Sequence, residues 1–239
     1  MVSSRFWEYY AVRYFVGTVI GAIAIVAFNE YSMSPLKGQI LPTLSSFKEA
    51  GAEHLVVLAA LGLAYCYVAS APILAAHALR GQLDLASNKG LLTSLVPVAV
   101  AFVVLAGAGH LALSVPLWGA KFWAMVIVAF VLSFQVVLFM QALFSGFHRV
   151  SDYYSRLAEA RAGASKTVGE YVESYRHLRE HGNAFGIVLL EICLATACIA
   201  APSVQWLSVL LVLWILPATG VWLIGTVLEA RVSKVPTTP

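Results

Sequence analysis

The side chains best suited to chemistry gather in one polar segment, residues 147–191, of a chain otherwise made of apolar runs. Within it, Glu173, His177 and His181 follow one another at intervals of four residues, so a helix would carry them on one face. Carboxylate and imidazole groups at this spacing can bind a divalent metal, which is the one cofactor that the sequence suggests. The simpler alternative, which we favour, is a solvated helix face on which Glu173 pairs with His177.

Arg176 and His181 enclose a second pattern, the hexapeptide Arg-His-Leu-Arg-Glu-His. It resembles the R-[NHD]-x-x-x-H pattern of the HEPN ribonucleases, in which arginine and histidine from two subunits meet to cleave RNA. The resemblance covers six residues and implies Arg176 and His181 as the catalytic pair. Membrane-embedded accessory proteins of type VI CRISPR systems carry a degenerate motif of this kind, so the resemblance also implies a role in prokaryotic antiviral defence.

A third interpretation gives the polar segment no chemistry and makes it a docking or gating element for a soluble cytoplasmic partner. Without Glu191, its six basic residues slightly outnumber its five acidic ones, and basic groups beside a membrane attract anionic lipids by about 1 kcal/mol each. We rank this interpretation first because it needs only charge and helix geometry. The chain is therefore not expected to be an enzyme or to bind nucleic acid, and an RNA-cleaving or metal-dependent enzyme is the alternative.

Glu191 is the acidic residue that lies deep in an apolar run. A carboxylate carried into a membrane span costs about 2.5 to 3.5 kcal/mol, so we expect Glu191 to face protein or water and to have a partner. Arg13, near the start of the first apolar run, is the candidate counter-ion. Gln135, deep in the fourth run, would bond across to another helix or line a water-filled pore. Glu191, Arg13 and Gln135 are thus candidate ion-pair or pore residues.

The elements that must position these side chains are membrane helices. The composition is 60% hydrophobic and 11% charged, whereas soluble domains carry roughly 25% charged residues. Six apolar runs approach the roughly 20 residues that a helix needs to cross a bilayer. The sequence therefore predicts an all-α, polytopic bundle of about six transmembrane helices, with spans near residues 11–28, 55–78, 91–113, 120–145, 184–201 and 204–228.

These spans divide the chain into three regions. Residues 1–145 form a four-span region, 146–183 a cytoplasmic helical hairpin, and 184–239 a two-span hairpin with a short cytoplasmic tail. Because helical character persists from Tyr153 to Ala162, we expect the fourth span to continue out of the membrane as one helix. The hairpin would then join the fourth and fifth spans.

The Lys and Arg residues orient the bundle. With six spans, twelve of them fall on the side of both termini and the polar loop, and three fall on the other side. Basic residues accumulate on the cytoplasmic side of membrane proteins. The count predicts a multi-pass protein of the bacterial inner membrane with both termini in the cytoplasm.

Gly17 and Gly21 have the GxxxG spacing that lets another helix approach the first span closely. We favour packing within one subunit over dimerisation at this face. The sequence lacks nucleotide-binding and common hydrolytic motifs, and its two halves show no convincing repeat of the kind found in secondary transporters. We therefore expect a homo-oligomeric channel, pore-like effector or membrane sensor governed by its hairpin, with a secondary transporter as an alternative.

Overall fold

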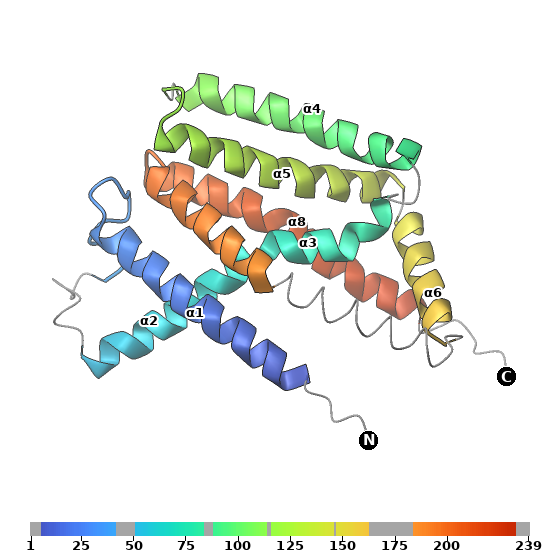
Figure 1. The fold of residues 1–239 in the computed structure, drawn as a ribbon, viewed down its shortest axis with the longest axis horizontal. Helices are drawn as coiled ribbons and strands as arrows, with labels where there is room; N and C mark the ends of the chain where they lie inside the picture. The colour runs from blue at the N-terminus through green and yellow to red at the C-terminus, as the bar shows by residue number, and fades with distance from the viewer. Residues whose placement is uncertain are drawn as a thin grey trace.

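A computed structural model describes residues 6–41, 51–83, 88–113, 116–145, 147–162 and 184–232 of the chain. Within these ranges 86% of the residues are helical and none is in a strand, which confirms the predicted all-α class. The helices are α1 (Phe6–Glu30), α2 (Ala52–Ala69), α3 (Ala71–Leu79), the 3₁₀ turn η2 (Arg80–Gln82), α4 (Asn88–Leu113), α5 (Ala120–Phe144), α6 (His148–Ala162), helix 184–200 and α8 (Val204–Val232) (Figure 1).

Four helical segments in the described residues are long and apolar enough to cross a membrane: Ala52–Gln82, Leu92–Ala112, Ala120–Phe144 and Val204–Thr226. Two further apolar helices, Tyr14–Glu30 and Ala184–Ala200, are shorter. The surface of the bundle is correspondingly apolar, and large side chains such as Val103 and Leu111 of α4 are exposed. A surface of this kind suits lipid rather than water, so the chain has the character of a multi-pass membrane protein.

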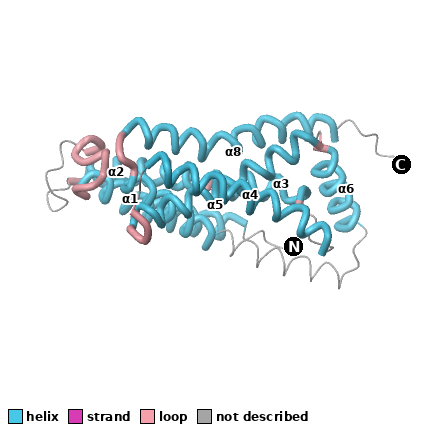
Figure 2. The backbone as a smooth tube through the Cα atoms, turned by 90° about the horizontal axis from the view of Figure 1, so that it is seen from above, coloured by secondary structure: helices cyan, strands magenta, loops and turns pink. Residues whose placement is uncertain are grey.

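The long helices run side by side, with α4 at one edge and α5 beside it (Figure 1). The second layer consists of α8 and α3, which pack against α5 and against each other. At the other edge α1 crosses α2, and these two helices make the most extensive contact among the labelled helices. The view from above shows the same elongated bundle, with α6 across one end (Figure 2).

The second expected span is broken near its middle, between α2 and α3. Pro72 has no N–H to donate back along the helix, and the Ile73 N–H donates to the carbonyl of Ser70 at 3.0 Å instead of to that of Ala69. The break therefore leaves the Ala69 carbonyl without its usual helical partner. Pro97 and Pro217 behave differently, since α4 and α8 continue through them.

The prediction of one helix running from the fourth span into the polar segment is wrong. α5 ends at Phe144, and the N–H of Phe147 closes this end by donating to the Ala142 carbonyl at 2.9 Å. Phe147 has φ 60°, in the left-handed region that terminates helices. The chain then turns, so that α6 lies steeply inclined to α5 (Figure 1). The Ser145-Gly146 dipeptide is a turn signal at this point, although the helical propensity on both sides of it favours one continuous helix.

α6 is held against the end of the broken span. Its Tyr154 hydroxyl donates to the carbonyl of His77 at 2.9 Å, and the guanidinium of Arg80 lies 5.3 Å from the ring centres of Tyr153 and Tyr154. Gly81 leaves no room for a side chain beside Tyr153. The first part of the polar segment is thus a helix packed on the end of α3.

Candidate membrane-embedded acidic site

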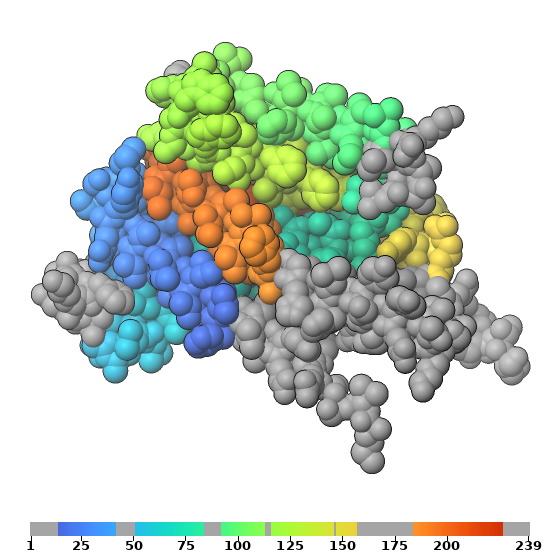
Figure 3. Space-filling view, viewed as in Figure 1, coloured from blue at the N-terminus to red at the C-terminus, as the bar shows by residue number. Residues whose placement is uncertain are grey.

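Glu191 lies near the middle of the apolar helix 184–200 and is fully buried, with 0% of its surface exposed. Neither side-chain oxygen has a hydrogen-bond partner within the described part of the chain. The space-filling view shows helix 184–200, in orange, with α1, in blue, along one side of it (Figure 3). A buried carboxyl group inside an apolar helix is the most distinctive chemical feature of the described structure.

Helix α2 forms one wall of this site. The hydroxyl of Tyr65 donates to the backbone carbonyl of Glu191 at 2.7 Å. The Tyr65 ring packs edge to face on Phe28 of α1, with 5.6 Å between the two ring centres. Cys66, next to Tyr65, is also fully buried, and its thiol lies beside the Glu191 carboxyl, where it can act as a weak donor. Tyr65 therefore fixes helix 184–200 against α2 through the backbone carbonyl of Glu191, and the Cys66 thiol is the polar side-chain group that α2 places beside the carboxyl group.

Helix α1 forms the second wall, at Gly17. A Cβ atom built on Gly17 would overlap the thiol of Cys66 and would lie 3.3 Å from Oε1 of Glu191. A residue at position 17 must therefore be small because it borders the acidic site. The GxxxG spacing alone does not indicate this second reason. Arg13 belongs to α1 one turn earlier, but its side chain lies outside the described residues, so its pairing with Glu191 stays a prediction.

Gln135 lies in a second polar cluster, which joins α5 to α8 and α2. Its amide Nε2 donates to the carbonyl of Trp214 at 3.3 Å, and the indole Nε1 of Trp214 donates to the carbonyl of Ala69 at 3.3 Å. Gln135 and Trp214 are both fully buried, and Oε1 of Gln135 has no partner within the described ranges. The indole therefore satisfies the carbonyl that the helix break before Pro72 released.

Three residues of these clusters, Tyr65, Cys66 and Trp214, were not predicted as site residues from the sequence. A signal for Trp214 was present, because a proline inside a span releases a carbonyl and tryptophan carries a donor that suits it. The pairing of Trp214 with Ala69 across 145 residues follows only from the three-dimensional arrangement.

The proposed metal and ribonuclease residues lie outside the described part of the chain. Glu173, Arg176, His177 and His181 all fall between residues 163 and 183, so the structure places none of them. Among the described residues, no group of three or more His, Cys, Asp or Glu side chains could hold a metal ion. The two buried clusters therefore carry the functional argument.

Comparison with known proteins finds no matching family model, no matching curated protein and no matching solved structure.

Proposed function

We propose that this protein spans the bacterial inner membrane six times, with both termini in the cytoplasm. Support comes from the four long apolar segments, the two shorter apolar helices and the twelve-to-three distribution of basic residues. α1 as a whole has 25 residues, about 37 Å at 1.5 Å per residue, which exceeds the roughly 30 Å hydrocarbon core. Helix 184–200 is joined to α8 by three residues, as the two arms of a membrane hairpin would be.

Within this topology, we propose that Glu191 is the ion-handling residue of a gated proton or cation pathway. The observation that carries the proposal is the full burial of both carboxyl oxygens without a hydrogen-bond partner among the described residues. An acidic group in this position is costly, and intramembrane acids characteristically mark ion pathways and proton relays. A purely structural role would favour an amide or an apolar residue at position 191 instead.

The enclosed carboxyl group implies a closed conformation in which Glu191 holds a proton, because an uncompensated buried charge costs far more than a neutral acid. Opening requires α1 to separate from helix 184–200. Gly17 offers the least resistance there, since it contributes no side chain to the contact with Glu191. Water would then reach the carboxyl group, and Arg13, one turn along α1, would stabilise the carboxylate that forms.

The polar region from α6 to residue 183 is the element that would control this opening, in a homo-oligomer or through a soluble cytoplasmic partner. α6 supports this part of the proposal because it packs on the end of α3, whose other end adjoins the α2 wall of the acidic site. Movement of α6 would therefore be transmitted along α3 toward Tyr65 and Cys66.

The test is ion flux into liposomes that contain the purified protein, with imposed gradients of protons and, separately, of potassium. We expect Glu191→Gln to abolish the flux while leaving the thermal unfolding temperature unchanged, because glutamine reproduces the shape of the neutral acid but cannot release a proton. Glu191→Asp should retain part of the flux. The matched control is Glu30→Gln, an exposed acid at the end of α1, which should conduct like the wild type. Wild-type protein without flux, or Glu191→Gln with full flux, would exclude this function.

A further inference from the structure

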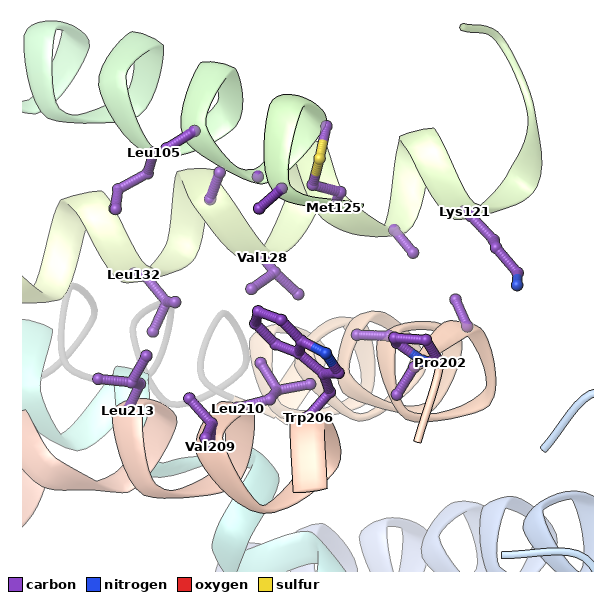
Figure 4. A pocket seen from close by; sticks show the side chains of 18 residues that line it. Leu105, Lys121, Met125, Val128, Leu132, Pro202, Trp206, Val209, Leu210 and Leu213 are labelled. Atoms are coloured by element: carbon purple, nitrogen blue, oxygen red, sulfur yellow. The ribbon is translucent and has the colours of Figure 1, made fainter. Parts of the chain in front are cut away.

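A cavity of ≈ 400 Å³ lies among α4, α5, helix 184–200 and α8, near the end of the bundle where α5 begins (Figure 4). It is separate from the acidic site, because Glu191 does not line it. The volume falls in the range of sites that bind small molecules.

Small residues on two helices create the space. Ala108 and Ala112 of α4 and Ala197 and Ala200 of helix 184–200 line the cavity, and their short side chains occupy little of its volume. Trp206 of α8 contributes its indole, and leucine, valine and methionine side chains complete the wall (Figure 4). The interior of the cavity is therefore suited to a hydrocarbon chain.

Among the described residues that line the cavity, Lys121 is the one that carries a charge, and it lies at the cavity's edge in the first turn of α5 (Figure 4). Its side chain is exposed, so its ammonium group is available to a ligand. No salt bridge involving Lys121 occurs within the described residues. An apolar cavity with one cation at its edge is complementary to an amphiphile that has one apolar chain and an anionic head.

We propose that this cavity binds a single-chain anionic amphiphile, such as a long-chain fatty acid, with its hydrocarbon chain beside Trp206 and its carboxylate at Lys121. The ligand would enter from the bilayer past α4, because only 6% of the apolar stretch of α4 is buried within the described structure. A phospholipid fits less well, since its second chain would need a further cavity of similar size. The site does not depend on Glu191 and goes beyond the proposed ion pathway.

Trp206 provides a direct readout. Bromine atoms on the chain of a fatty acid quench tryptophan fluorescence on contact, and subtracting the signal of Trp206→Phe isolates this one indole among the six of the chain. A titration of the purified protein in detergent compares the brominated fatty acid with the brominated alcohol of the same chain length. We expect the acid to bind about fivefold more tightly, the effect of one partly exposed charge pair.

Charge and space are then tested separately. Lys121→Gln should remove the preference for the acid over the alcohol, whereas Lys121→Arg should keep this preference. The matched control is Lys37→Gln, which changes an exposed lysine outside the cavity and should leave the preference unaltered. Ala200→Phe should abolish quenching by both ligands in a protein whose unfolding temperature is retained, and Ala197→Leu gives a second filling variant should that protein not fold. Three outcomes would each overturn the proposal. The wild type could bind acid and alcohol with equal affinity, or quenching could survive both filling variants. A brominated two-chain phosphatidylglycerol could also bind more tightly than the fatty acid.

Discussion

Gly21 of α1 and Gly62 of α2 meet backbone to backbone. A Cβ atom on Gly21 would overlap the carbonyl group of Gly62, and one on Gly62 would overlap the backbone of α1 at Thr18 and Ala22. Without side chains between them, the two helices gain close van der Waals contact along the crossing. The GxxxG spacing of α1 is therefore used within the subunit in this structure.

This contact predicts a large effect from a single methyl group. We expect Gly21→Ala to lower the free energy of unfolding by about 1 to 3 kcal/mol, because the helices must move apart to admit it. The measurement is chemical or thermal unfolding of the purified protein in detergent. Gly107→Ala is the matched control, since a Cβ atom on Gly107 of α4 would meet nothing within 4 Å. A loss of stability as large for Gly107→Ala as for Gly21→Ala would show that the close contact is not what Gly21 provides.

The indole of Trp214 gives a second prediction. Trp214→Phe removes the only donor shown for the released Ala69 carbonyl, and a buried group left unsatisfied costs about 1 to 3 kcal/mol. We expect a loss of unfolding free energy in that range. Trp222→Phe in the same helix should change it little, because Trp222 is 65% exposed and faces outward. Equal unfolding curves for Trp214→Phe and Trp222→Phe would contradict the role assigned to the indole.

For Gln135 we expect a substitution to change the free energy of unfolding only a little, unlike the substitutions at Gly21 and Trp214. Gln135→Met removes the bond to the Trp214 carbonyl but also removes an unpartnered buried oxygen, so the two effects offset and the net change should stay within about 1 kcal/mol. Liposome flux measured on the same preparation then reports function alone. If Gln135 belongs to the ion pathway, flux falls while unfolding is unchanged. Unaltered flux would limit Gln135 to helix packing.

The helical class and the approximate positions of the apolar helices could be predicted from composition and run length, because both depend on residues near each other in sequence. The stop between α5 and α6 is signalled in the sequence by the Ser145-Gly146 dipeptide, but apolar and polar helix-forming residues flank it and outweigh this signal. The deciding feature is the left-handed backbone of Phe147, which the sequence does not reveal. Glu191 and Gln135 stood out as polar residues in apolar runs. Their surroundings at Gly17, Cys66 and Trp214 come from other helices, and no local pattern encodes which helices meet.

The proposed topology predicts which positions react with a membrane-impermeant thiol reagent. In a background without native cysteines, Lys37→Cys should be labelled on intact cells, whereas Ser165→Cys should be labelled only after the membrane is opened. Lys37 is suitable because it is exposed in the turns that follow α1, and Ser165 belongs to the polar segment that precedes helix 184–200 in the sequence. Labelling of Ser165→Cys from outside would rule out six spans with a cytoplasmic polar loop.

The last prediction separates the two ways in which Glu191 can be accommodated. If Glu191 is held as a neutral acid, Glu191→Gln keeps the fold intact, and adding Arg13→Gln changes the unfolding free energy independently, with a coupling energy below about 0.5 kcal/mol. If Glu191 is instead ionised and paired with Arg13, Glu191→Gln alone leaves a buried arginine without its partner, and Arg13→Gln recovers part of the loss, with a coupling of about 0.5 to 3 kcal/mol.

We expect the first outcome, because among the described side-chain positions of α1 it is Gly17, an uncharged residue, that borders the Glu191 carboxyl. The measurement is a double-mutant cycle of unfolding free energies in detergent, for the wild type, the two single variants and the double variant. Ion flux is then measured on the same four preparations. If Glu191 exchanges protons, Glu191→Gln loses flux without losing stability. A strong coupling with flux retained in the double variant would make Glu191 and Arg13 a structural ion pair, and the ion pathway would have to be sought elsewhere in the bundle.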